Sequence, residues 1–152
     1  NYVRRLVYFP FLTHIRRMGP QLNIGWLSLE HPYPKAPSSP EFIERLDALT
    51  AYHFWPMRGF HVCEFCDTIV EHPRHGLLGA AEIRVRAPDC WYASPNLLVH
   101  YVEAHEYRPP DEFIDAAMKG PAPFTPQYQK DLDDLSLATQ HGFKVHPRTP
   151  AP

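Results

Sequence analysis

With 152 residues, the chain has the length of one domain with a single hydrophobic core, and an apolar share of 44% excludes an intrinsically disordered protein. Lysine and arginine number 15 against 17 aspartates and glutamates, and this net charge of −2 argues against a nucleic-acid-binding protein. The 18 prolines limit the length of helices and strands, so we expect an α+β fold with irregular proline-rich arms.

The first third of the chain predicts two strands and one helix. Residues 2–9 are rich in β-branched and aromatic side chains, which favours a strand, and a helical turn is expected over 12–18. The apolar run 24–29 predicts a buried strand. A helix is predicted over 40–52, because Ser39-Pro40 is typical of a helix start and apolar residues follow at helical spacing.

The middle of the chain predicts short strands around a turn. Residues 59–62 and 68–70 are expected to enter and leave this turn as strands, and 71–79 to form a loop. Alternation of apolar and polar residues predicts a half-buried strand over 81–85, followed by a brief extended piece at 90–93.

The last third predicts helices separated by prolines. Ser94-Pro95 repeats the pattern of a helix start, which predicts a helix to about residue 105. A second helix is expected over 111–118, and a weak third over 127–139. We expect a single domain over residues 1–146 and a loose C-terminal tail over 147–152.

One set of residues indicates a metal site. Cys63 and Cys66 form a Cys-x2-Cys pair, and His100 and His105 lie on a predicted helix. Two thiolates and two imidazoles are the ligand set that tetrahedral zinc selects. The sequence therefore predicts a zinc-stabilised domain whose site is centred on residues 58–118.

The spacing of these residues restricts the kind of zinc site. Thirty-three residues separate Cys66 from His100, which is too many for a DNA-reading Cys2His2 finger and leaves room for a hairpin, as in a treble clef. Five residues of helix turn through about 140°, so His100 and His105 do not share a helix face. Both can reach one ion if the helix ends or loosens near Ala104.

Other readings of these residues remain open. Cys63 and Cys66 could form a thioredoxin-like redox pair, but the predicted strands on both sides do not fit that motif. His61, His72 and His75 are alternative ligands, which we expect to be surface histidines. Cys90 beside Trp91 is expected to be a buried core thiol.

The sequence favours a structural over a catalytic metal. Four protein ligands leave no position for water, whereas a catalytic site would need an open position and a general base, for which Glu103 and Glu106 are candidates. Neither a His-Glu-x-x-His motif nor the ordered signature of zinc deaminases is present. The sequence therefore does not decide whether the protein is an enzyme, although it favours a protein without enzymatic activity.

Three segments together resemble a group of small uncharacterised bacterial proteins. They are Arg58–Cys66, Gly79–Val85 and His100–Phe113, which carry a CxxC…HYxxxHxYxPPxxF block. The resemblance covers the central third of the chain and implies a bacterial, soluble, metal-binding protein. It implies no activity.

These observations lead to three functional hypotheses. The first is a domain with a structural zinc ion that binds another protein. The second is a metal-dependent hydrolase with an open zinc site, and the third is a nucleic-acid-binding accessory protein that uses its basic N-terminal residues, Arg4, Arg5, Arg16 and Arg17.

Cysteine content and hydropathy predict the compartment. Three cysteines, two of them in a metal-binding pattern, fit a reducing environment. No apolar run has the length of a transmembrane helix, and the first ten residues lack the features of a signal peptide. We expect a cytoplasmic protein without membrane association.

Overall fold

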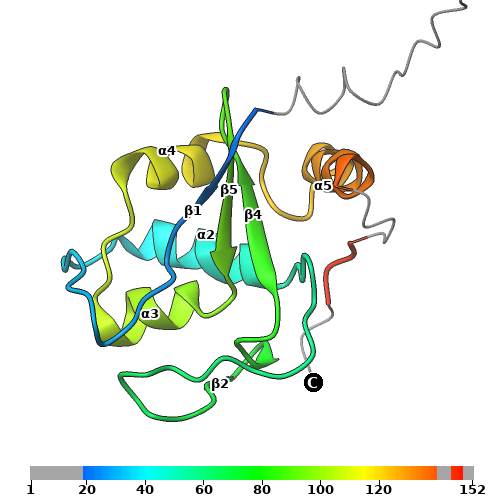
Figure 1. The fold of residues 1–152 in the computed structure, drawn as a ribbon. Coiled ribbons are helices and arrows are strands. Elements are labelled where there is room, and N and C mark those ends of the chain that lie inside the picture. Colours follow the sequence, from blue (N-terminus) through cyan, green and yellow to red (C-terminus); the bar gives the residue numbers. More distant parts are fainter. Residues whose placement is uncertain (1–18, 140–144, 149–152) are drawn as a thin grey trace, which may run out of the picture.

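A computed structural model of the chain describes residues 19–139 and 145–148. This part of the chain forms a small α+β fold (Figure 1). Its strands are β1 (Gln21–Asn23), β2 (Glu71–His72), β3 (Gly76–Leu77), β4 (Glu82–Arg86) and β5 (Trp91–Pro95). Its helices are α2 (Pro40–Thr50), α3 (Leu98–His105), α4 (Asp111–Lys119) and α5 (Pro126–Ala138). None of the described helices is both long and apolar enough to cross a membrane.

The main sheet has three strands in the order β1-β5-β4. β4 and β5 are antiparallel neighbours, with Arg84 opposite Ala93, whereas β1 is parallel to β5, with Leu22 opposite Tyr92. All five residues of β5 are buried, as expected for the central strand of a sheet that is covered on both faces. The hairpin β2–β3 forms a separate two-stranded sheet.

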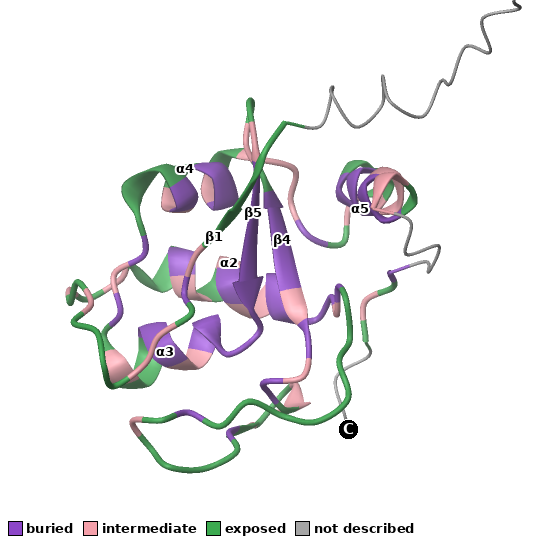
Figure 2. Ribbon diagram, in the orientation of Figure 1, coloured by how far each residue is buried: buried purple, intermediate pink, exposed green. Residues whose placement is uncertain are grey.

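The helices cover the sheet from two sides. α2, α3 and α4 gather on one side, where α2 and α4 contact β4, α3 packs against α2, and each helix carries buried residues (Figure 2). Aromatic rings join these layers, since Phe113 of α4 lies 5.5 Å from the ring of Tyr92 and 6.3 Å from that of Phe42. α5 lies beside β4, where the Tyr128 hydroxyl donates a hydrogen bond to the Arg84 carbonyl at 2.9 Å.

Several predicted elements are confirmed. Ser39 caps α2, because its Oγ accepts a hydrogen bond from the Phe42 backbone N–H at 3.2 Å. The alternating segment forms β4, and the acidic helix start forms α4. The weakly predicted last helix is α5, which Thr125 caps through the Tyr128 N–H.

The predicted helix start at Ser94-Pro95 is wrong. Both residues belong to β5, where Ser94 pairs with Ile83 and is completely buried. α3 begins three residues later, and its N-cap, Leu97, makes no side-chain capping bond. Pairing with β4 therefore outweighs the local capping preference at this position.

Three other expectations for strands and loops are also corrected. The first strand is Gln21–Asn23, not 24–29, because Gly25 turns the chain with a φ of +72°. Residues 59–62 and 68–70 do not form strands. The segment predicted as a loop, 71–79, instead contains the hairpin β2–β3.

The ends of the chain are described only in part. The predicted strand 2–9, the helical turn 12–18 and the four N-terminal arginines lie outside the described residues. Pro147 pairs with Tyr52, and the Arg148 N–H donates to the Ala51 carbonyl at 2.8 Å. The extent of the domain, 1–146, stays a prediction.

Candidate metal centre

A tight turn carries the two cysteines. The Cys63 N–H donates to the Thr68 carbonyl at 2.9 Å, and the Cys66 N–H donates to the Cys63 carbonyl at 3.1 Å. Asp67 has a φ of +51°, which reverses the chain. This turn, residues 63–68, is called the knuckle below, and it brings both sulfur atoms to one side.

The two histidines come from the last two turns of α3. The helix ends at His105, and Glu106 follows in the left-handed conformation with a φ of +53°. The expectation that the helix ends near Ala104 is thereby confirmed. Because His105 is the last helical residue, its ring reaches that of His100, with 3.2 Å between the Nε2 atoms.

Cys63, Cys66, His100 and His105, called the Cys2His2 cluster below, lie close enough together to bind a metal ion. The Nε2 atom of His105 is 3.3 Å from each sulfur atom, and that of His100 is 3.5 Å from the Cys66 sulfur. Metal–sulfur bonds of about 2.3 Å and metal–nitrogen bonds of about 2.0 Å give tetrahedral edges of roughly 3.3–3.8 Å. The distances fall at or near this range.

Hydrogen bonding alone does not account for this convergence. Three atoms surround Nε2 of His105 at 3.2–3.3 Å. A ring nitrogen has either one N–H or one lone pair, and both lie in the ring plane, so it makes one good hydrogen bond. Four donor atoms around a common point are instead the arrangement of ligands around an ion.

The cluster lies at the edge of the core. Cys63 is completely buried and Cys66 is exposed, while His100 and His105 are half-buried. The ring of Phe65 packs 5.1 Å from that of His105, and Tyr33 donates a hydrogen bond from its hydroxyl to the His105 carbonyl at 3.2 Å. These aromatic contacts shield one side of the cluster from water.

Burial disfavours charge on three of the four side chains, through the pKa values of His100, His105 and Cys66. Burial lowers the pKa of His100, with a further contribution from His105, and burial also lowers the pKa of His105. Burial and the neighbouring Cys63 raise the pKa of the Cys66 thiol. A bound cation would reverse this preference and release thiol protons, so metal binding here depends on pH.

The two candidate bases lie on the same helix as the histidines. Glu103 is in α3, and its Oε2 lies 3.9 Å from Nε2 of His72. Glu106 is the C-cap of α3, and its backbone carbonyl accepts a hydrogen bond from Ala36 at 3.0 Å.

Of the three alternative ligands, His61 has the expected surface position, because it is exposed and lies 5.9 Å from the ring of Trp26. His72 and His75 differ from the expectation. Their side chains are largely buried in the hairpin and approach Asp47 of α2, which the sequence did not indicate. The His-x2-His spacing of His72 and His75 was the signal that the sequence offered. The carboxylate that lies beside them belongs to Asp47, which comes from a different element, α2.

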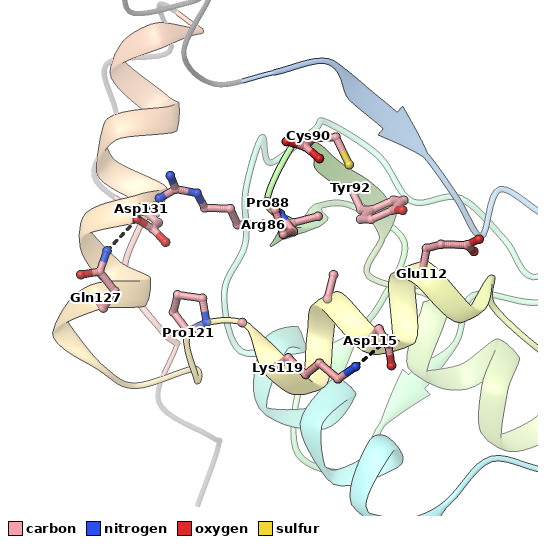
Figure 3. A pocket seen from close by; sticks show the side chains of 14 residues that line it. Arg86, Pro88, Cys90, Tyr92, Glu112, Asp115, Lys119, Pro121, Gln127 and Asp131 are labelled. Carbon is pink, nitrogen blue, oxygen red and sulfur yellow. Dashed lines mark hydrogen bonds and ion pairs between the residues drawn. The ribbon is translucent and has the colours of Figure 1, made fainter.

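The structure also contains a cavity of about 720 Å³ on the other side of the molecule, between β5, α4 and α5 (Figure 3). Its charged residues are largely paired with one another, Arg86 with Asp131 and Lys119 with Asp115. Cys90, expected in the core, is half-buried and lines this cavity. No residue of the Cys2His2 cluster lines it.

The fold and the site together define a small α+β domain with a Cys2His2 cluster between a knuckle and a helix end. The model of a protein family described as a domain of unknown function (DUF7919) matches residues 4–118. The chain belongs to this family. No curated protein and no solved structure matches the chain.

Proposed function

We propose that the protein is a zinc-stabilised domain that binds another protein, with Cys63, Cys66, His100 and His105 as the zinc ligands. The convergence of two sulfur and two nitrogen atoms is the observation that carries this proposal. Thiolates select soft or borderline ions, and a Cys2His2 set with tetrahedral edges favours zinc among them.

A structural ion fits this cluster better than a catalytic one. Four protein donors complete the tetrahedral sphere and leave no position for water or substrate. The hydrolase alternative requires one of the four to be absent from the ion and Glu103 or Glu106 to act as general base. The mutual approach of all four donor atoms argues against such an open site.

The ion would hold together segments that are far apart in the sequence. The knuckle, the hairpin β2–β3 and α3 follow in the order of a treble clef. The segment 24–36 is attached to the same region, because the Leu29 N–H donates to Glu64 Oε2 at 2.8 Å and the Ala36 N–H to the Glu106 carbonyl. Zinc binding would stabilise this whole end of the molecule.

Exposed apolar side chains near the knuckle support a protein partner. Such side chains are usual sites of association when several occur together. Trp26 contacts His61, and Phe60 and Val62 precede the first cysteine. The exposed apolar residues of this region are Trp26, Leu29, Phe60, Val62, Ile69 and Leu77, between 42% and 67% exposed.

Metal analysis tests the zinc site. After dialysis against a weak chelator, we expect the Cys2His2 cluster to retain one zinc ion per chain. Cys63→Ser and His100→Ala should lose this ion and unfold at lower temperature, whereas Cys90→Ser should retain it. Unchanged zinc content in the first two variants would disprove the ligand assignment, and an intact fold with loss of hydrolytic activity would favour the enzyme.

The partner is tested with surface variants that keep zinc. The double variant Phe60→Ser/Val62→Ser should lose protein partners recovered by affinity purification, while Leu137→Ser, at an even more exposed apolar position on α5, should retain them. Recovery of the same proteins with both variants would contradict an interface at the knuckle.

A further inference from the structure

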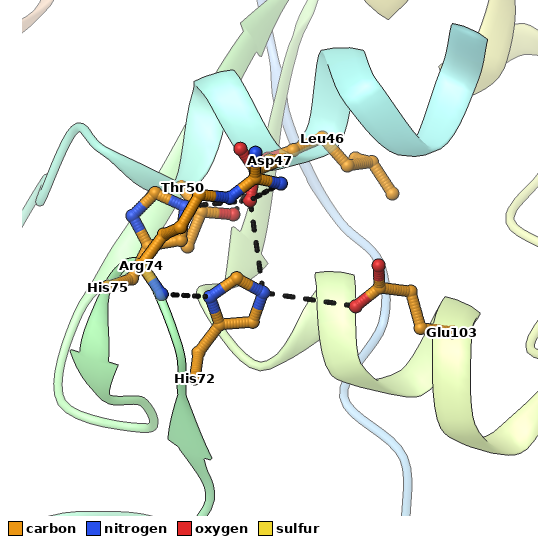
Figure 4. Close-up of polar contacts among 7 residues, drawn as sticks. All are labelled: Leu46, Asp47, Thr50, His72, Arg74, His75 and Glu103. Atoms are coloured by element: carbon orange, nitrogen blue, oxygen red, sulfur yellow. Dashed lines mark hydrogen bonds and ion pairs between the residues drawn. The ribbon is translucent and has the colours of Figure 1, made fainter. Parts of the chain in front are cut away.

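A second group of metal-binding side chains lies where the hairpin β2–β3 meets α2 (Figure 4). Asp47 Oδ1 is 3.0 Å from Nε2 of His75 and 3.8 Å from Nε2 of His72. The side chains of Asp47, His72 and His75 are only 13%, 10% and 6% exposed. These three residues are called the Asp-His cluster below.

A fourth donor faces the cluster from another element. Figure 4 shows Glu103 extending from α3 toward His72, and its Oε2 is 3.9 Å from Nε2 of His72. A cavity of about 420 Å³, lined in part by His72 and Glu103, opens between them. The cluster is therefore buried among protein atoms on one side and accessible on the other.

We propose that Asp47, His72 and His75 bind a second divalent metal ion of the zinc type, and that Glu103 lies beside the fourth coordination position. Two imidazoles and one carboxylate are donors that zinc and similar transition ions accept. Three protein ligands leave a coordination position free, and here that position would face the cavity. The second site would thus be open, unlike the Cys2His2 cluster.

Two contacts of Arg74 compete with the ion. The Arg74 guanidinium lies 2.8 Å from Asp47 Oδ1 and neutralises the carboxylate that the ion would use. The side chain is 59% exposed, so it can turn into solvent when a metal ion replaces it.

The second contact concerns the protonation of His72. The Arg74 backbone N–H donates to Nδ1 of His72 at 3.2 Å, which places the proton of the neutral ring on Nε2. An ion bound at Nε2 requires the other tautomer. The exposed Arg74 amide then bonds to water instead, so the change costs one solvent-exposed hydrogen bond.

The geometry requires only small shifts of these side chains. Bonds of about 2.0–2.2 Å from a tetrahedral ion to nitrogen and oxygen give edges of roughly 3.4 Å. The distances of 3.0 and 3.8 Å from Asp47 lie on either side of this value.

Calorimetric titration with zinc chloride tests the second site. With the Cys2His2 cluster already filled, the unchanged protein should bind one further equivalent. Asp47→Asn and His75→Ala should lose it, while His146→Ala, which removes an exposed histidine outside both clusters, should bind as before. Zinc content of one ion per chain and an unchanged circular dichroism spectrum would show that the variants remain folded.

A second variant keeps the proposal testable if the buried substitutions unfold the chain. Arg74→Ala changes an exposed side chain and removes the competing cation, so it should tighten binding of the second zinc ion up to about fivefold. If neither the unchanged protein nor Arg74→Ala takes up a second equivalent, the proposal is wrong. Because the Cys2His2 cluster stays loaded throughout, this result would leave the first site unaffected.

Discussion

Glu106 occupies a backbone conformation that suits glycine better than any other residue. It follows α3 with a φ of +53°, and its side chain is exposed. The left-handed conformation places Cβ close to a carbonyl oxygen in all residues but glycine, which is why glycine is common directly after helices. Glu106 therefore holds the end of α3, and with it His105, at some cost in free energy.

Glu106→Gly should raise the free energy of unfolding by about 0.5–1 kcal/mol at saturating zinc, since relief of the left-handed strain exceeds the added entropy of the unfolded chain. Urea denaturation provides the measurement. Glu44→Gly is the matched control, because it places glycine at an exposed position inside α2 and should lower the same quantity by about 1 kcal/mol. A destabilised Glu106→Gly protein would show that the glutamate side chain is needed.

At the scale of elements, Asn96 joins the start of α3 to the segment that leaves the hairpin. Its Oδ1 accepts a hydrogen bond from the Gly79 N–H at 2.7 Å, and its own N–H donates to the Ala81 carbonyl at 2.9 Å. Asn96 is completely buried, so no water can replace these bonds. These two bonds fix the position of the residue directly before the N-cap of α3.

Asn96→Ala should lower the free energy of unfolding by about 1–3 kcal/mol, because it leaves the Gly79 N–H buried without an acceptor. Asn23→Ala, at an exposed position of β1, should change it by less than about 0.5 kcal/mol. Chemical denaturation of both variants gives the comparison. Equal effects would mean that water reaches Gly79.

The same local pattern gave one right and one wrong helix start. Ser39-Pro40 starts α2 because no strand competes for Ser39, whereas Ser94 lies opposite Ile83 and is buried in the sheet. A local pattern cannot report this pairing, since β4 and β5 meet only after the chain folds. The apolar run 24–29 was likewise misleading. Gly25, which lies inside this run, turns the chain, and β1 therefore ends at Asn23.

The two candidate sites also differ in how far the sequence could predict them. The four residues of the Cys2His2 cluster were predictable because two close pairs of chemically suited residues mark it in the sequence. Asp47 was not, because nothing near it in the sequence indicates that α2 will face His72 and His75. A cluster formed by single residues from separate elements becomes visible only once their packing is known.

At the scale of the whole molecule, removal of the metal should affect the two ends of the structure differently. The rings of Phe42, Tyr92 and Phe113 pack together without any contribution from the Cys2His2 cluster. The knuckle and the segment 24–36, in contrast, expose most of their residues, and the rings of Tyr33 and Phe65 attach them beside that cluster.

After chelation, we expect amide hydrogen exchange to accelerate first in residues 26–36 and 58–70, while α2 and β5 keep their protection. Local opening needs less free energy where few apolar contacts must break. Exchange measured by mass spectrometry with and without zinc tests this, and the same experiment on Cys63→Ser is the control. Uniform acceleration along the chain would instead show that the whole fold depends on the ion.

The parallel pairing of β1 with β5 also has a consequence for how the protein is made. Gln21 pairs with Trp91, so β1 has no partner until about seventy more residues have left the ribosome. Cys63 and Cys66 likewise come together with His100 and His105 only after these later residues have been made. Because contacts so distant in sequence close slowly, the sheet and the Cys2His2 cluster would both be completed only after α3 has emerged.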